Sequence, residues 1–329
     1  MSKDKSNNVA IYLKSIKKHV GTAIDGVTNV DTKNAFSLLK KLNIEDNDNI
    51  EDNIIYYPGI TLLFIISNFS KKSKKTTPHG YYIASGLVQI MALINSGNDN
   101  VNAYSEIIVN MYNCVVRNLS SVYNNDTNMA DNDKLDLHNK CLNYVNKKIF
   151  SCMQIHSLEK KVSKKKSDLI IKSGGFLEKY QKLELVSETN ILNYIKSKYG
   201  SLFQLSYVLG WYMGISSSNN QDMIKVLETI GQILGVLYKV TYDFMTIDDE
   251  IKELISTDRN YSDNIIINCG IKKSFSIFVE QKTKFIEESM EAELYIVNIR
   301  VILAKMEDIV NDVIENSDFT SNTEASSFR

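Results

Sequence analysis

One pair of residues has the spacing of a metal site. Cys152 and His156 stand at i and i+4, so on a helix their side chains would share one face, and zinc accepts both ligand types. Zinc needs four ligands, and the sequence offers no second pair to complete them. The other histidines, His19, His79 and His138, have no identifiable Ser or Cys partner. We therefore interpret Cys152 and His156 as packing residues.

The cysteines and the start of the sequence bear on the compartment. The 4 cysteines form no C-x-x-C pair and no dense framework that would indicate disulfides or a metal cluster. Scattered thiols of this kind are commonly buried and reduced. The first residues carry no apolar stretch typical of a secretory signal. We therefore expect an intracellular protein in a cytosol-like, reducing compartment.

The charge balance argues against one class of partner. The chain has 38 Lys and Arg against 39 Asp and Glu, a formal net charge of −1. Proteins that bind nucleic acid normally carry a basic excess, so no nucleic-acid partner is expected. Two lysine-rich runs, 71–75 and 160–166, are interpreted as solvated loops, the alternative being contact with an anionic membrane or another polyanion.

Helices must position whatever chemistry the chain performs. With 2 Pro and 14 Gly in 329 residues, the sequence is poor in the residues that turns and sheet edges need. Apolar residues recur at helical spacing, and the predicted helices include 9–20, 33–42, one that starts at Pro58, 81–94, 135–157, 187–214, 221–255 and 272–316. The apolar run 59–69 is far shorter than the roughly 20 residues that span a bilayer, so no transmembrane segment is expected.

These elements predict an all-α fold, a single large helical bundle. Segments 86–94 and 202–213 are apolar over most of their circumference, so other helices must surround them. We place one helical domain at 9–316, after a flexible N-terminus at 1–8 and before a disordered, polar tail at 317–329.

Several segments of the sequence resemble a known family. The run 198–203, Lys-Tyr-Gly-Ser-Leu-Phe, and the apolar helix after it resemble the Lys-Thr-Gly-x-Leu-Phe segment of the trans-isoprenyl diphosphate synthases, the polyprenyl synthetases. The run 235–246 corresponds to that family's Gly-x-x-Phe-Gln-Ile-x-Asp-Asp-x-x-Asp, and 87–94 resembles the helix that delivers its first aspartate motif. The resemblance implies a bundle of the isoprenoid-synthase type.

The acidic motifs of the family are degenerate in this chain. The resemblance implies two Asp-Asp-x-x-Asp motifs that face each other and hold magnesium on an allylic diphosphate, since the departing negative charge needs hard cations. The first motif aligns with a segment that keeps one acid, at Ser96, Gly97, Asp99 and Asn100. The second keeps one acid of three, at Tyr242, Asp243 and Thr246. No cation remains at 56–61, where the family clamps the second diphosphate.

Few residues remain that the resemblance assigns to a site. It implies that Lys198 and Lys239 contact substrate and that Asp243 is a residual metal ligand, the alternative for Asp243 being a hydrogen-bonded or capping role. Asp248, Asp249 and Glu250 lie further along the same predicted helix and are interpreted as a solvated helix end.

These departures favour a protein without catalysis. The expected function is a degenerate polyprenyl-synthetase-like pseudoenzyme, a partner subunit of an active prenyl diphosphate synthase, as a homodimer or heterodimer. One alternative is a divergent, magnesium-dependent prenyltransferase that condenses allylic diphosphates with isopentenyl diphosphate in isoprenoid biosynthesis. A second is a lipid-binding or structural protein with an isoprenoid in its apolar interior. No cofactor is expected, and magnesium only if activity remains.

Overall fold

All regular structure in the described part of the chain is helical. The computed structural model describes residues 11–19, 54–70, 77–95, 109, 130–153, 183–214 and 220–316. Within them the all-α prediction is confirmed. The predicted terminal segments, 1–8 and 317–329, and the predicted helix 33–42 lie outside the described residues.

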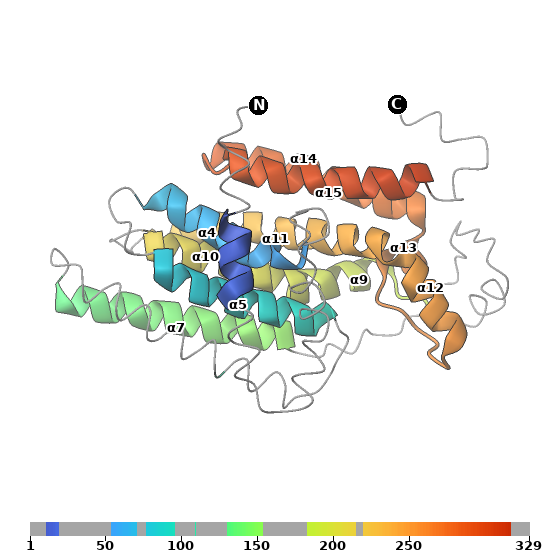
Figure 1. The fold of residues 1–329 in the computed structure, drawn as a ribbon, viewed down its shortest axis with the longest axis horizontal. Coiled ribbons are helices and arrows are strands. Elements are labelled where there is room, and N and C mark those ends of the chain that lie inside the picture. The colour runs from blue at the N-terminus through green and yellow to red at the C-terminus, as the bar shows by residue number, and fades with distance from the viewer. Residues whose placement is uncertain are drawn as a thin grey trace.

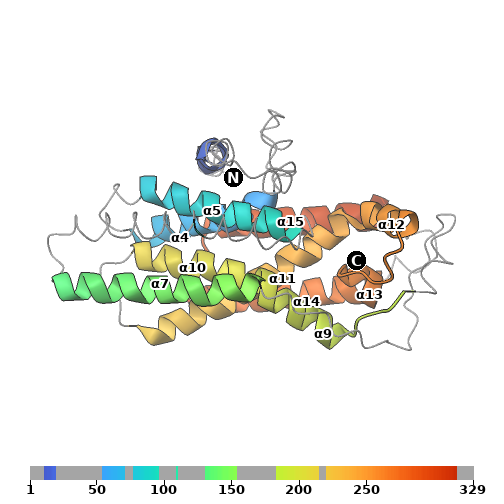
Figure 2. The ribbon, with the colours of Figure 1, turned by 90° about the horizontal axis from the view of Figure 1, so that it is seen from below.

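The described helices are seen in two perpendicular views in Figure 1 and Figure 2. A first helix covers residues 11–19. The others, in chain order, are η2 (Ile54–Tyr56), α4 (Tyr57–Phe69), α5 (Thr77–Asn95), α7 (Asp131–Met153), α9 (Glu188–Ile195), η3 (Lys196–Gly200), α10 (Ser201–Gly214), α11 (Gln221–Met245), α12 (Ile247–Ser256), α13 (Ile265–Cys269), α14 (Ile271–Glu291) and α15 (Val297–Asn316).

Two apolar helices form the centre of the bundle. In α10 every residue from Ser201 to Met213 is buried, and α4 is buried from Tyr57 to Ile66. The two helices pack on each other, while α11 and α7 cover α10 and α5 covers α4. Figure 1 shows α14 and α15 along one edge of the bundle and α7 along the opposite edge, with α4, α10 and α11 between them. The expectation that 202–213 is surrounded by other helices is therefore confirmed.

The run predicted as one helix over 187–214 contains a π turn. α9, η3 and α10 follow one another without a break, and η3 is a π-helical segment. It passes very close to α11: a Cβ on Gly235 would lie 2.6 Å from the Cα of Gly200. Only glycine fits at position 235, because any side chain there would overlap the backbone of η3.

The helix predicted over 221–255 is in fact two helices. α11 ends at Met245, and the Thr246 hydroxyl donates to the Tyr242 carbonyl at 2.8 Å. α12 then begins at Ile247, with Asp248, Asp249 and Glu250 in its first turn. Acidic side chains stabilise the N-terminus of a helix, so this acidic run favours a new start over a continuous helix.

The helix predicted over 272–316 is also wrong as a single element. α14 ends at Glu291 and α15 begins at Val297. Between them Glu293 has a positive φ of 58°, and the backbone N–H groups of Leu294 and Tyr295 both donate to the Ser289 carbonyl. The turn contains no Gly or Pro, so hydrophobic periodicity alone predicts that the helix continues through it. α7 likewise begins at Asp131, four residues before its predicted start, with Asp131 and Asp133 in its first turn.

A buried ionic cluster as candidate functional site

Lys239 and Asp243 form an ion pair inside the protein. They stand one turn apart on α11, with 2.6 Å between Lys239 Nζ and Asp243 Oδ1. The residues are 3% and 1% exposed. The Lys239 ammonium also lies 5.3 Å from the centre of the Tyr199 ring and 5.8 Å from that of Tyr242. Because charges this deeply buried are stable only when paired, each residue holds the other in the fold.

A second carboxylate, Asp263, approaches the same ammonium. Its Oδ1 lies 3.7 Å from Lys239 Nζ, and its Oδ2 accepts a 3.1 Å hydrogen bond from the Tyr194 hydroxyl. That hydroxyl accepts in turn from Lys198 Nζ at 2.9 Å. The Asp263 side chain is 38% exposed, so the cluster reaches solvent on this side. Lys198 and Lys239, both singled out from the sequence, are thus linked through Tyr194 and Asp263.

The remaining hydrogen bonds of Asp243 fasten α11 to α13. Its Oδ2 accepts from the backbone N–H of Ile265 at 2.9 Å, and its carbonyl accepts from the Asn264 amide at 3.1 Å. Asn264 also caps α13, accepting from the N–H of Ile266 at 2.9 Å. Both carboxylate oxygens of Asp243 therefore have partners within the protein.

Burial and neighbouring charges shift the pKa values of Asp243 and Asp263 in opposite directions. Burial raises the pKa of Asp243 to about 7; the Lys239 ammonium opposes this rise and the Asp263 charge adds to it. Burial acts on Asp263 in the same direction, but Lys239 and Lys198 outweigh it and hold the pKa of Asp263 below its ordinary value. For Lys239, burial lowers the pKa, yet Asp243 and Asp263 together raise it above the usual lysine value. Asp263 and Lys239 therefore stay charged, while the pKa of Asp243 lies above that of an ordinary aspartate.

Glu250 anchors the loop that carries Asp263. It pairs with Arg259 and accepts a 2.5 Å hydrogen bond from the Ser262 hydroxyl. Arg259 also donates to the Tyr261 carbonyl at 3.1 Å. Burial raises the pKa of Glu250. Asp248 and Asp249 are exposed, as expected for a solvated helix end, but that interpretation is wrong for Glu250, whose side chain is only 16% exposed.

The other residues of the two degenerate motifs have different positions. Ser96, Gly97, Asp99 and Asn100 lie outside the described residues. α5 ends just before them at Asn95, whose amide donates to the Tyr238 hydroxyl at 2.9 Å. Tyr238 is one turn before Tyr242 on α11, and their rings stack with centres 6.3 Å apart. The end of α5 therefore meets α11 beside the ionic cluster.

The described residues do not fit a magnesium cluster. Within them, no group of three or more His, Cys, Asp or Glu side chains could hold a metal ion. Asp243 and Asp263 both face the Lys239 ammonium, which lies where a cation would have to lie. Magnesium also requires several oxygen ligands in octahedral geometry, and Tyr242 and Thr246 offer no carboxylate. Cys152, interpreted from the sequence as a packing residue, is buried, and His156 is outside the described residues.

Sequence reasoning missed Tyr194, Asp263 and Asn264. A weak signal existed for two of them. Tyr194 stands at i−4 from Lys198, and Asn264 precedes an apolar run as an N-cap residue does. Asp263 has no such signal, because it reaches Lys239 only through the turn after α11 and the loop after α12.

Comparisons with known proteins find likenesses among solved structures. No protein-family model matches the chain, and no curated protein matches it. Among solved structures, the chain is similar to a geranyltransferase from Helicobacter pylori that was crystallised with magnesium and isoprenyl diphosphate. The two are 11% identical, the likeness covers 96% of this chain and 99% of that one, and the TM-score is 0.48. Among the described residues no helix is long and apolar enough to cross a membrane.

Proposed function

We propose that this chain is a non-catalytic, polyprenyl-synthetase-like helical protein that acts as the partner subunit of an active prenyl diphosphate synthase. The observation that carries the proposal is the buried Lys239–Asp243 pair. It stands in the segment that resembles the second aspartate motif of the polyprenyl synthetases.

The ion pair is incompatible with the metal chemistry of that motif. Asp243 is the one carboxylate retained there, and its oxygens are bonded to Lys239 and to the Ile265 N–H. A metal ion that displaced Lys239 would leave an ammonium buried without its main counter-charge, which costs about 3–5 kcal/mol when one partner of such a pair is lost. An internal cation therefore takes the role that a metal would need to fill.

The two candidate substrate-binding lysines are engaged as well. Asp263 faces Lys239 directly and is linked to Lys198 through the Tyr194 hydroxyl. A diphosphate would have to compete with this carboxylate for both lysines. Cleavage of a carbon–diphosphate bond needs concentrated positive charge, and this cluster is already neutralised from within.

The catalytic half of the proposal is tested by turnover. Purified protein is incubated with magnesium, isopentenyl diphosphate and geranyl or farnesyl diphosphate, and pyrophosphate release is measured beside an active synthase. The expected result is release no greater than in the protein-free control. Turnover by the wild-type chain that disappears in Asp243→Asn would contradict the proposal and identify a divergent prenyltransferase.

The partner half is tested by co-expression with an active farnesyl or geranylgeranyl diphosphate synthase. The expected result is a complex that survives size-exclusion chromatography and changes the rate or the product length of the synthase. Two proteins that elute separately, with unchanged turnover, would contradict the partner role. An isoprenoid extracted from the chain alone would instead favour a lipid-binding protein.

A further inference from the structure

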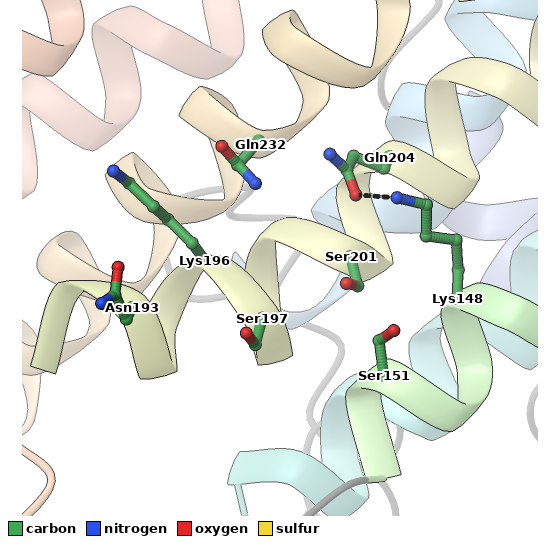
Figure 3. Close-up of a pocket in the computed structure, with 8 residues that line it drawn as sticks. All are labelled: Lys148, Ser151, Asn193, Lys196, Ser197, Ser201, Gln204 and Gln232. Atoms are coloured by element: carbon green, nitrogen blue, oxygen red, sulfur yellow. Dashed lines mark hydrogen bonds between the residues drawn. The ribbon is translucent and has the colours of Figure 1, made fainter. Parts of the chain in front are cut away.

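A polar pocket lies beside the π turn, where three parts of the bundle meet. Its volume is about 370 Å³, within the range of small-molecule sites. Figure 3 shows the eight lining side chains, which come from α7, from the continuous run of α9, η3 and α10, and from α11. They are Lys148, Ser151, Asn193, Lys196, Ser197, Ser201, Gln204 and Gln232.

The chemistry of the lining selects the charge of a ligand. Every lining side chain is polar: two are ammonium groups, three are hydroxyls and three are amides, with no carboxylate among them. An apolar chain would gain little in such a pocket, and a cation would face two ammonium groups. The lining therefore fits a small anion with several hydrogen-bond acceptors.

The two lysines contribute differently. Lys148 is neutralised: its Nζ lies 3.0 Å from Glu228 Oε1 and donates to Gln204 Oε1 at 2.6 Å. Lys196 makes no ion pair among the described residues, so the pocket carries one uncompensated positive charge from these two side chains. This charge is the attractive element for an anion.

Ser201 contributes a hydroxyl from the first turn of α10 to the pocket lining, and the residue as a whole is only 5% exposed. A hydroxyl can turn its hydrogen toward a bound group that accepts hydrogen bonds. The π turn places Ser197 and Lys196 beside Ser201, on the side that faces the pocket. π turns of this kind occur frequently at functional sites.

We propose that this pocket binds a small organic phosphate, with Lys196 and Ser201 as its main contacts. Phosphate suits the lining better than a carboxylate, because its additional oxygens can accept from donors that project from three helices. The proposal goes beyond the proposed function and does not depend on it, because the turnover and co-purification tests involve no residue of this pocket.

Inorganic phosphate serves as the probe for the first test. The full chain is titrated by calorimetry at constant ionic strength, first with phosphate and then with glycerol phosphate. The expected result is saturable binding at one site, weakened about tenfold in Lys196→Gln and to a similar extent in Ser201→Ala, since each loses a hydrogen bond to a charged group. Absence of saturable binding to the wild-type chain would overturn the proposal.

Two further variants locate the binding site. Lys225→Gln removes an exposed lysine of α11 whose side chain is 74% exposed, and it should change the affinity less than twofold. If Lys225→Gln weakens binding as much as Lys196→Gln does, phosphate is attracted by the general positive charge of the surface. The pocket is then not the binding site, and the proposal is wrong. If Lys198→Gln abolishes binding while Lys196→Gln does not, phosphate binds at the ionic cluster and the proposal is wrong. Should Lys196→Gln lose its helical circular dichroism, Ser201→Ala decides the test.

Discussion

Lys196 and Lys198 stand two residues apart on the same π turn but belong to regions of opposite character. Lys198 donates to Tyr194 and through it reaches Asp263 and the buried Lys239–Asp243 pair, where charges are balanced inside the protein. Lys196 lines the polar pocket and has no ion pair among the described residues. The comparison teaches that the number of charges does not make a binding site: a site needs charges or donors that the fold leaves without internal partners.

The largest expected effect concerns the buried ionic cluster around Lys239 and Asp243. Asp243→Ala leaves Lys239 buried with Asp263 at 3.7 Å as its nearest counter-charge. We expect a loss of about 3–5 kcal/mol in the free energy of unfolding, measured by urea denaturation. The matched control is Asp222→Ala, which removes an exposed pair with Lys225 and should cost less than about 0.5 kcal/mol. Similar losses in the two variants would show that the buried pair contributes little.

A second variant acts on both regions together. Gly235→Ala places a methyl group 2.6 Å from the Gly200 backbone and must push η3 away from α11. We expect a loss of about 1–3 kcal/mol in the free energy of unfolding, together with weaker phosphate binding. In the control, Gly200→Ala, the new methyl would meet the flexible Gln232 side chain at 3.1 Å, so a smaller loss is expected. A reversed order would contradict the close crossing.

The pH dependence of stability isolates Asp243. Its pKa is about 7 in the folded protein against 3.8 for an ordinary aspartate, so between these values the folded state binds the extra proton. Stability should therefore fall as pH rises from about 4 to 7, by at most roughly 1.4 kcal/mol per pH unit. Asp243→Asn should remove this contribution from the curve. In Asp263→Asn the fall in stability should end at a lower pH, because the charge of Asp263 raises the pKa of Asp243.

The smallest effect tests the cap that joins α13 to the cluster. Asn264→Ala removes the bonds to the N–H of Ile266 and to the Asp243 carbonyl, and should cost about 1–2 kcal/mol by urea denaturation. Asn220 caps α11 with one bond to Met223 in an exposed position, so Asn220→Ala should cost less. Equal costs would mean that the bond between Asn264 and Asp243 adds nothing to capping.

The sequence predicted what short-range periodicity controls. The apolar circumference of 202–213 is enough to place α10 in the interior, because such a surface is stable only when other helices cover it. The i, i+4 spacing of Lys239 and Asp243 likewise brings them to one face of α11. These features depend on residues within a turn or two of one another.

The rest depends on where helices end and what they then meet. The ends at Met245 and Glu291 carry no Gly or Pro, so periodicity extended both helices too far. Asp263 reaches the cluster only because α11 stops, α12 leads the chain away and the following loop returns. The polar pocket is equally hidden, since its lining comes from helices far apart in sequence and from the π turn.

The π turn η3 also sets the rotation of α9 about the helix axis relative to α10. A π turn holds one residue more than an α-helical turn, and each residue of an α-helix advances the chain by about 100°. Deleting one residue within η3 would restore regular winding and rotate α9 by that angle relative to α10. Tyr194 would then swing away from Asp263, while the α10 side of the pocket stayed in place. This extra residue therefore acts as a rotational offset that lets one continuous helical run serve two differently directed polar sites.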